Sequence, residues 1–371
     1  MATDKIYLSA PHMGENELKY IHEAFDTNWI STVGPQINAF EQRLSTYCGT
    51  EGAAALASGT AAIHLALKIL GVSSGDKVLC QSFTFAASAN PITYLGAEPV
   101  FIDSEEDTWN MDPEATEAAI KEIGAQNIKA IIPVHLYGMP AKMDEILSIG
   151  NKYGIPVIED AAEALGSKYK NKNCGSFGDI GILSFNGNKI ITTSGGGALL
   201  SDNTDYIKKV KFLATQARDE APHYEHTHIG YNYRMGNINA AIGLGQMHVL
   251  NTRVDKRRSI YNWYRNLLGS NVEFQGQNLN DTDYYSNRWL TSVLMENFEQ
   301  RENWRLTLEQ NQIECRPLWK PMHMQPVFKD CKFYGKGVSE LLFERGLCLP
   351  SGSGMTEDEF DRISNCLKTL I

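Results

Sequence analysis

The chain lacks the features that mark secreted, membrane-spanning or nucleic-acid-binding proteins. Its seven cysteines are odd in number and show no C-x-x-C spacing, which favours reduced thiols over a disulfide framework. No uninterrupted apolar run approaches the length of a membrane span, and residues 1–9 lack the apolar region of a signal peptide. A net charge of -10 and a pI near 5.4 oppose general affinity for nucleic acids or anionic membranes. We therefore expect a cytoplasmic protein without nucleic-acid or membrane partners.

The 371 residues exceed the length of an average domain. Between residues 77 and 160, short apolar runs alternate with segments of helical periodicity. This alternation predicts an α/β fold with a mostly parallel central sheet and helices on both faces. The predicted strands are 77–85, 99–103, 129–136, 155–160 and 180–185, and the predicted helices are 86–95, 113–123 and 142–153. We divide the chain into a large domain, residues 1–249, and a smaller C-terminal α+β domain, residues 250–371.

One lysine, Lys189, lies on the connection between two apolar runs, residues 180–185 and 198–200. A lysine in a glycine-rich connector is usually a solvated surface charge. The functional alternative is an amine near the end of a buried strand, where desolvation favours the neutral form that a Schiff base requires. The stretch itself does not decide between the two interpretations.

Ser58, Gly59 and Thr60 precede a strongly helical segment that ends near Leu70. Ser58 is a favoured N-cap residue, and a glycine lets a ligand approach the free N–H groups of the first helical turn. An ordinary capped helix is the simpler interpretation, and a phosphate-binding site is the functional one.

Glu159 and Asp160 end a predicted strand with two adjacent carboxylates. Successive side chains of a strand point to opposite faces, so only one of the two belongs to any given site. The simpler interpretation is that Asp160 caps a following helix. The functional alternative is that it holds a protonated ring nitrogen through a charge-assisted hydrogen bond.

Phe85 and Ser184 fall at or beyond the ends of predicted strands, where parallel sheets bind their ligands. Together with Lys189, Asp160 and the helix start at Ser58, they specify a ligand with a phosphate, an aromatic ring, a basic ring nitrogen and an aldehyde. Pyridoxal 5'-phosphate (PLP) meets this description.

An ordered set of short motifs spans nearly the whole chain. The motifs are Ala57-Ser-Gly-Thr-Ala61, Ser82-Phe-Thr-Phe-Ala86, His135-Leu-Tyr-Gly138, Glu159-Asp-Ala-Ala-Glu-Ala-Leu-Gly166, Ser184-Phe-Asn-Gly-Asn-Lys189 and Gly230-Tyr-Asn-Tyr-Arg234. This set resembles the DegT/DnrJ/EryC1/StrS family of sugar aminotransferases. The resemblance implies the aspartate-aminotransferase-like architecture called fold type I, PLP or its amino form (PMP) as cofactor, and a homodimer with the active site at the subunit interface.

The resemblance also implies roles for individual residues. Lys189 would carry the Schiff base, Asp160 would bind the pyridine nitrogen, and Phe85 would stack on the ring. The phosphate would be held by three residues of one chain and by an asparagine that reaches across from a second subunit. These four are Gly59, Thr60, Ser184 and Asn232. Glu163 corresponds to a position often occupied by glutamine, near the ring oxygen of the cofactor.

The implied activity is transfer of an amino group from L-glutamate to C4 of a nucleotide-linked 4-keto-6-deoxy sugar. Many members follow the lysine with T-T-G-E-G-G-A-L, whereas this chain has Ser194 for the first Gly and Gly195 for the Glu. This departure, with Asn186-Gly-Asn188 and residues 316–323, resembles the branch that makes UDP-4-amino-4,6-dideoxy-N-acetylglucosamine for bacillosamine.

Three alternatives stand beside this interpretation. The first is an aminotransferase for another nucleotide sugar, such as GDP-perosamine or a dTDP-amino sugar. The second is a sugar-deoxygenating enzyme, but such relatives typically replace the lysine with histidine, so Lys189 argues against it. The third is a non-catalytic regulator that retains the fold.

Arg316 and His323 are candidate ligands of the substrate phosphates, because arginine suits bidentate phosphate binding. Solvated surface side chains are the equal alternative. His223, His226 and His228 suggest a metal site only weakly, since the segment lacks thiolate ligands at zinc spacing and a second cluster. We expect no metal, and expect these histidines to flank the sugar site or to be solvated.

Overall fold

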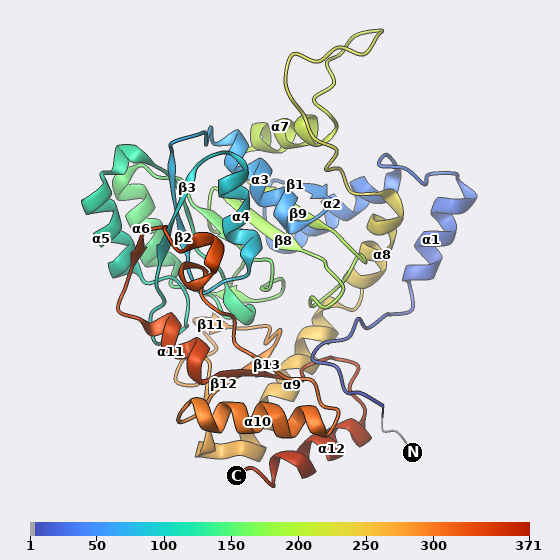
Figure 1. The fold of residues 1–371 in the computed structure, drawn as a ribbon. Helices are drawn as coiled ribbons and strands as arrows, with labels where there is room; N and C mark the ends of the chain where they lie inside the picture. The colour runs from blue at the N-terminus through green and yellow to red at the C-terminus, as the bar shows by residue number, and fades with distance from the viewer. Residues whose placement is uncertain (1–3) are drawn as a thin grey trace.

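The computed structural model describes residues 4–371, and its centre is a mostly parallel β-sheet (Figure 1). The strands are β1 Gly52–Leu56, β2 Lys77–Gln81, β3 Glu98–Ile102, β4 Ile128–Ile132, β5 Ile158–Asp160, β8 Ile180–Ser184, β9 Gly197–Ser201 and β14 Phe333–Tyr334. Their order is β1-β9-β8-β5 in one part and β14-β3-β2-β4 in the other. Parallel bridges from Ile131 to Val157 and from Val134 to Asp160 join the two parts. Within this sheet β9 runs antiparallel to both of its neighbours, and the other pairs are parallel.

Helices cover both faces of the sheet. One face carries α3 (Gly59–Ile69), α4 (Ala86–Tyr94) and α7 (Thr204–Ala214). The other carries α2 (Pro35–Cys48), α5 (Pro113–Ile123), α6 (Met143–Tyr153) and α8 (Asn237–Met247), and α1 (Glu17–Asp26) packs on α8. In β9, Leu199 faces the first group, whereas Ala198 and Leu200 face the second. A strand buried on both faces needs apolar residues at successive positions, which explains the continuous apolar runs of the sequence. The predicted α/β class is confirmed.

Strand β1 is not among the strands predicted from the sequence. Its three successive alanines lack the β-branched and aromatic side chains that usually signal a strand. The strand forms because it pairs with β9 along its whole length, from Gly52 opposite Ser201 to Leu56 opposite Gly197. Tertiary pairing therefore overrides a weak local preference.

A second unit of helices and antiparallel strands lies below the large sheet in Figure 1. Its sheet contains β10 Glu273–Phe274, β12 Thr291–Leu294, β15 Gly346–Leu349 and β13 Arg316–Pro317, in that order. Its helices are α9 Leu250–Leu268, α10 Phe298–Gln310, α11 Val338–Arg345 and α12 Glu357–Leu367. The break between α8 and α9 falls at residues 248–249.

The two units are linked at both ends of the chain. Ile6 forms a parallel bridge with Ile313 and lies in the hydrophobic core of the C-terminal unit. Conversely, β14 belongs to the C-terminal part of the chain but adds a strand to the large sheet beside β3. The domain boundary after residue 249 stays a prediction, and these two contacts fasten the units on either side of it.

Short elements complete the fold. A small antiparallel sheet contains β6 Lys168–Tyr169, β7 Lys172–Asn173 and β11 Tyr284–Tyr285. Single 3-10 turns span Ala125–Asn127, Leu136–Gly138, Gly269–Asn271, Met322–Met324 and Pro326–Phe328. Residues 216–233 form a long loop that projects above α7 (Figure 1). Among residues 4–371, no helix has both the length and the apolar composition needed to cross a membrane.

Asp103, directly after β3, ties the start of α11 to the large sheet. Its fully buried carboxylate accepts hydrogen bonds from the N–H groups of residues 336–339 and from the Ser339 hydroxyl. We expect Asp103→Ala to lower the free energy of unfolding by about 3 kcal/mol, because several buried donors lose a charged acceptor together. Urea denaturation measures this loss. The exposed Asp205→Ala is the matched control and should change stability by less than about 1 kcal/mol; equal effects of the two variants would contradict the proposed link.

Candidate active site

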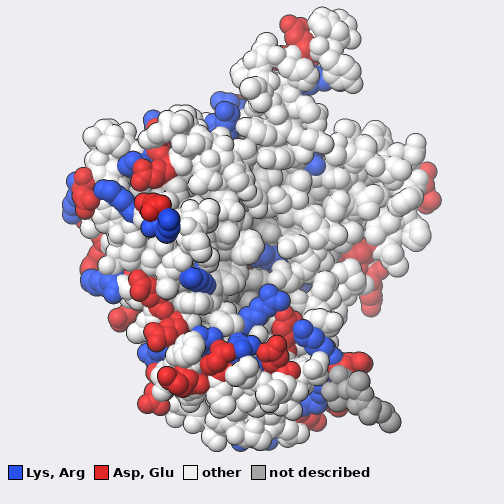
Figure 2. Space-filling model, in the orientation of Figure 1, with Lys and Arg blue, Asp and Glu red and all other residues white. Residues whose placement is uncertain are grey.

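A cavity of about 380 Å³ opens at the carboxyl ends of β5 and β8, and Trp289 and Trp319 from the C-terminal part complete its wall. Figure 2 shows this face of the molecule hollowed between the large body and the lower unit. Most of the residues singled out from the sequence line this one cavity: Gly59, Thr60, Phe85, Asp160, Glu163, Ser184 and Lys189. Residues spread over 131 positions of sequence therefore meet where parallel strands end.

The N-terminus of α3 forms one wall of the cavity. Ser58 caps the helix as predicted, because its Oγ accepts the Ala61 N–H at 3.0 Å. The first N–H groups of a helix have no intrahelical partner, and the helix dipole adds a partial positive charge there. Gly197 packs directly on this turn: a Cβ at that position would lie 2.3 Å from the Gly59 nitrogen. The result is a rigid wall of N–H donors suited to a phosphate group.

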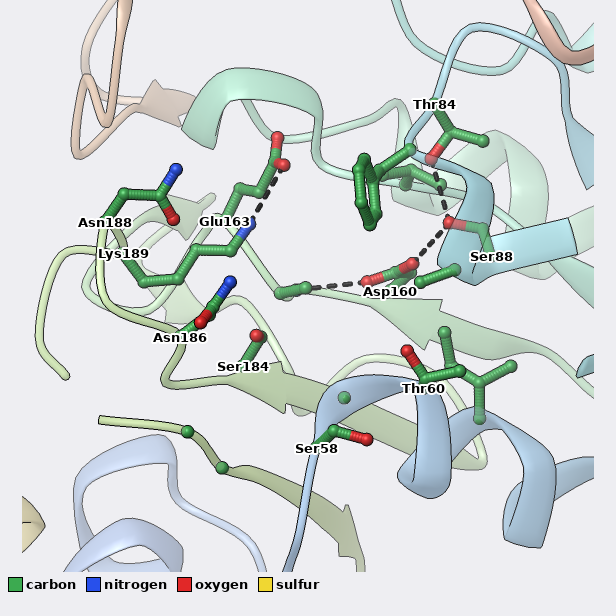
Figure 3. Close-up of a pocket in the computed structure, with 18 of the residues that line it drawn as sticks. Ser58, Thr60, Thr84, Ser88, Asp160, Glu163, Ser184, Asn186, Asn188 and Lys189 are labelled. Atoms are coloured by element: carbon green, nitrogen blue, oxygen red, sulfur yellow. Dashed lines mark hydrogen bonds and ion pairs between the residues drawn. The ribbon is translucent and has the colours of Figure 1, made fainter. Parts of the chain in front are cut away.

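Asp160 lies on the opposite side of the cavity from Lys189 (Figure 3) and is 3% exposed. Its Oδ2 accepts a hydrogen bond from the Ser88 hydroxyl at 2.6 Å, and its Oδ1 accepts the Ala162 N–H at 3.1 Å. The residues after β5 form turns, so Asp160 does not cap an α-helix. Burial raises the pKa of this carboxyl, while the two hydrogen bonds and the charge of Lys189 oppose the rise. A cationic ring nitrogen would supply the missing partner.

Glu159 points away from the cavity, as strand alternation predicts. Its carboxylate accepts the His135 Nε2–H at 2.7 Å and the N–H groups of residues 175, 177 and 178. The Ala141 N–H donates to His135 Nδ1 at 2.9 Å. Among the described residues, His135, Glu159 and Cys174 form a buried cluster of side chains of the kinds that bind metals. Both ring nitrogens and both carboxylate oxygens are already used, so the cluster acts as a hydrogen-bond network.

Lys189 extends into the cavity from the loop between β8 and β9. Its Nζ lies 3.1 Å from Glu163 Oε1 (Figure 3). The same nitrogen lies 4.1 Å from the centre of the Trp289 ring. The side chain is 12% exposed, so the interpretation as a solvated loop charge is wrong. Glu163 Oε2 accepts the Tyr137 N–H at 2.7 Å. Burial raises the pKa of the Glu163 carboxyl, while the charge of Lys189 and the Tyr137 N–H oppose this rise. The lysine amine is thus fixed in position above an aromatic ring.

The aromatic side chains form the rim of the cavity. The rings of Phe85 and Trp319 lie 5.4 Å apart, and Phe85 is 59% exposed. An adjoining cavity of about 430 Å³ shares both rings and Trp289 with the first. Arg316 lines this second cavity and pairs with Glu314 at 2.6 Å. Arg316 therefore lies next to the predicted site rather than inside it.

The unusual pair Ser194 and Gly195 lies on the loop that carries Lys189. Ser194 adopts φ +71°, in the left-handed region that favours glycine, which explains why many family members have glycine there. Its N–H donates to the Thr192 hydroxyl at 2.9 Å. Gly195 lines the cavity, and a Cβ there would meet nothing within 4 Å. The absent side chain therefore leaves open space in the cavity.

The remaining predicted residues lie outside the cavity. Asn232 sits at the base of the projecting loop, where it accepts a hydrogen bond from Gln216 at 3.0 Å. His323 is hydrogen-bonded to Ser82 at 2.7 Å and to Glu340 at 3.2 Å, so both of its ring nitrogens are occupied within the chain. His223, His226 and His228 belong to the projecting loop. His323 lines neither the catalytic cavity nor the cavity that contains Arg316, and its contact with a substrate stays a prediction.

Several cavity residues carried no usable signal in the sequence. Ser88 lies inside α4 and contacts the cavity only because that helix starts beside Phe85. Trp289 and Trp319 come from the C-terminal part, more than a hundred residues beyond Asp160. From the sequence, Asn188 indicated only a branch of the family. In the structure it lines the cavity, and its carbonyl accepts the Trp289 Nε1–H at 2.7 Å.

This fold brings a buried carboxylate, a lysine amine and a helix N-terminus together at its strand ends. The combination defines a PLP-dependent aminotransferase. A family model, the DegT/DnrJ/EryC1/StrS aminotransferase family, matches residues 11–368, and the chain belongs to that family.

Known relatives and solved structures agree with this assignment. The chain is 54% identical to the "Putative pyridoxal phosphate-dependent aminotransferase EpsN" of Bacillus subtilis, over 99% of this chain and 96% of that protein. It is 38% identical to the GDP-perosamine synthase of Caulobacter vibrioides, over 99% and 98%. The PLP form of the "Putative sugar aminotransferase Spr1654" from Streptococcus pneumoniae superimposes with a TM-score of 0.91 at 28% identity, covering 99% and 98%.

The residues of this chain fit PLP on three observations. The N–H donors of α3 suit its phosphate, and the close approach of Gly197 fixes them in place. The buried carboxylate of Asp160 has two hydrogen bonds but no ion-pair partner among residues 4–371, which suits a protonated ring nitrogen. Lys189 supplies the amine for covalent attachment.

We expect Asp160→Asn to stabilise the cofactor-free protein while weakening its response to PLP. Because burial raises the pKa of Asp160 in the folded state, its ionised form costs stability above the ordinary pKa of aspartate, and a neutral amide removes that cost at neutral pH. The amide also lacks the charge that holds a protonated ring nitrogen. Thermal melting with and without PLP measures both effects, with exposed Asp205→Asn as control. A lower melting temperature of the cofactor-free variant would contradict this account of Asp160.

Proposed function

We propose that this aminotransferase moves the amino group of L-glutamate to C4 of a UDP-linked 2-acetamido-2,6-dideoxy-4-keto-hexose, giving UDP-4-amino-4,6-dideoxy-N-acetylglucosamine. The observation that carries the proposal is the position of Lys189 Nζ, beside Glu163 and over Trp289, in one cavity with Asp160. An amine on one side of the cavity and a carboxylate on the other are what transamination requires.

When bound, PLP supplies an aldehyde for covalent attachment and an electron-accepting ring. The Asp160 carboxylate would accept the hydrogen of the ring nitrogen and keep that nitrogen protonated. The Lys189 amine would take a proton from one carbon and return it to another, since it is the one basic side chain among the described residues that line the cavity. Glu163 and Trp289 hold this amine between proton transfers.

Two features support a nucleotide-linked sugar as the amino acceptor. The adjoining cavity, lined by Arg316 and by aromatic rings, offers a place for the diphosphate and base of a nucleotide. The open space beside Gly195 suits a bulky substituent on the sugar, such as an acetamido group. Relatives named GDP-perosamine synthase, at 38% and 37% identity, make a GDP-linked sugar the second candidate substrate.

We further propose that the enzyme works as a homodimer in which Asn232 of one subunit completes the phosphate site of the other. Asn232 is exposed on a projecting loop and does not line its own cavity. Large apolar side chains are exposed on and after α1, namely Leu18, Phe25, Trp29, Ile30 and Val33. Figure 2 shows few charges over the upper right of the molecule, where Figure 1 places α1 and α8. Such a surface favours self-association.

The substrate is tested with a panel of UDP-, GDP- and dTDP-linked 4-keto-6-deoxy sugars and L-glutamate. We expect the highest kcat/KM with the UDP-linked 2-acetamido sugar, with the amino product identified by mass and its configuration by NMR. Lys189→Ala should lose turnover entirely because no other amine lines the cavity among the described residues. Turnover at the wild-type rate by this variant would refute the catalytic role of Lys189, and preference for a GDP sugar would replace the proposed substrate.

Subunit complementation tests the role of Asn232. We expect Lys189→Ala and Asn232→Ala homodimers to be weak or inactive and a mixture, after subunit exchange, to regain activity. A mixed dimer would contain one site with both native residues, because Lys189 comes from one chain and Asn232 from the other. Mixing Lys189→Ala with Asp160→Ala, which lie in the same cavity, is the control and should restore nothing. Absence of recovery in the first mixture would assign Asn232 no role across an interface.

A further inference from the structure

One face of α9 carries a row of basic and polar side chains. Arg258, Tyr261, Asn262 and Arg265 are spaced by three, four and seven positions, so they lie along one side of the helix. They line a cavity of about 180 Å³ that is closed on the other side by residues 276–281 and by Arg288. None of these residues lines the catalytic cavity or the cavity that adjoins it.

Arg288 is the buried member of this group. Its residue surface is 7% exposed, and its Nη1 donates to the Gln275 carbonyl at 2.8 Å. The guanidinium carbon lies 3.7 Å from the centre of the Tyr261 ring. Within residues 4–371, no carboxylate lies within 4.0 Å of this guanidinium. A buried cation without a counterion is costly, and burial lowers the pKa of Arg288 accordingly.

The surrounding charges leave an excess of positive charge in the cavity. Arg258 is neutralised by Asp281 at 2.6 Å, but Arg265, like Arg288, has no ion-pair partner in the described chain. Three arginines therefore face one aspartate, in a chain whose net charge is -10. The Tyr261 hydroxyl is also buried and has no hydrogen-bond partner among residues 4–371. Arg258, Arg265 and Arg288 thus bring three guanidinium groups to the lining of one small cavity.

We propose that this cavity is a second ligand site, which binds a phosphate group, either as inorganic phosphate or as the phosphate of a small phosphorylated metabolite. Arginine presents its donors in a planar fork that matches two oxygens of a phosphate. The anion would neutralise Arg288 and bind between Arg265 and Arg258. The cavity has about half the volume of the catalytic one, which fits a small oxyanion better than a nucleotide sugar.

The site lies close in sequence to the catalytic machinery. Arg288 directly precedes Trp289, whose ring contacts the Lys189 amine. It directly follows Asn287, whose side chain donates to the Glu163 and Leu165 carbonyls at 2.9 Å. Arg288 itself has φ +53°, so this turn has little conformational freedom. A phosphate bound at Arg288 would hold the backbone segment that positions both side chains.

The test is isothermal titration of PLP-loaded enzyme with inorganic phosphate at low ionic strength, so that the phosphate cradle of α3 is already filled. We expect saturable binding that weakens about tenfold or more in Arg265→Gln, because one charge-assisted hydrogen bond to the anion is lost. Arg265 is exposed, so this variant should fold normally, which circular dichroism checks. The exposed Arg43→Gln on α2 makes the same change in net charge and should bind as the parent does.

Further titrations separate this site from the catalytic one. Arg316→Gln, beside the catalytic cavity, should leave phosphate binding unchanged. Titration with a hexose phosphate then distinguishes the two sources of the phosphate group. If the hexose phosphate binds more tightly than inorganic phosphate, and Arg265→Gln loses this binding, the ligand is a phosphorylated metabolite. If the hexose phosphate binds more weakly, the ligand is inorganic phosphate. Absence of saturable binding, equal affinity in Arg265→Gln and the parent, or loss in Arg316→Gln alone would overturn the proposal.

Discussion

The hydrogen-bond network around Glu159 is the constraint on which the catalytic cavity depends. Burial opposes ionisation of this carboxyl, but the His135 hydrogen bond and the N–H donors of the 175–178 turn hold its pKa below the ordinary value. A carboxylate with this many donors cannot rotate or exchange faces. Because side chains alternate along β5, fixing Glu159 on one face fixes Asp160 on the other. The direction of the catalytic carboxylate is therefore set by its neighbour, which never meets the ligand.

The polar groups of the cavity are arranged for a bound ligand rather than for stability of the empty protein. Burial raises the pKa values of both Asp160 and Glu163, and the Lys189 amine forms its ion pair with Glu163. Such unbalanced burial is typical of functional sites, where local cost is offset by the rest of the fold. The antiparallel pairing of β1 with β9 is one of the contacts that stabilise the rest of the fold. It also fixes the start of α3 next to Gly197.

The sequence predicted those parts of the fold and site that depend on local pattern. Continuous apolar runs revealed the parallel strands, and the residues at their ends, such as Asp160 and Ser184, line the cavity. Where the determining contact is distant in sequence, the prediction failed or was silent. β1 has weak strand propensity and is specified by its pairing with β9. Trp289 enters the cavity through tertiary packing, and His323 is occupied by Ser82 and Glu340, partners that no spacing rule identifies.

The bridge between Ile6 and Ile313, which links the two units, also has a consequence for biosynthesis. A ribosome releases the N-terminal segment hundreds of residues before its partner exists. The same delay applies to β3, whose edge is covered by β14 only after residue 333 has been made. The nascent chain must therefore carry an unpaired strand edge and an exposed apolar segment through most of translation. Both are surfaces that chaperones recognise and that promote aggregation of incomplete chains.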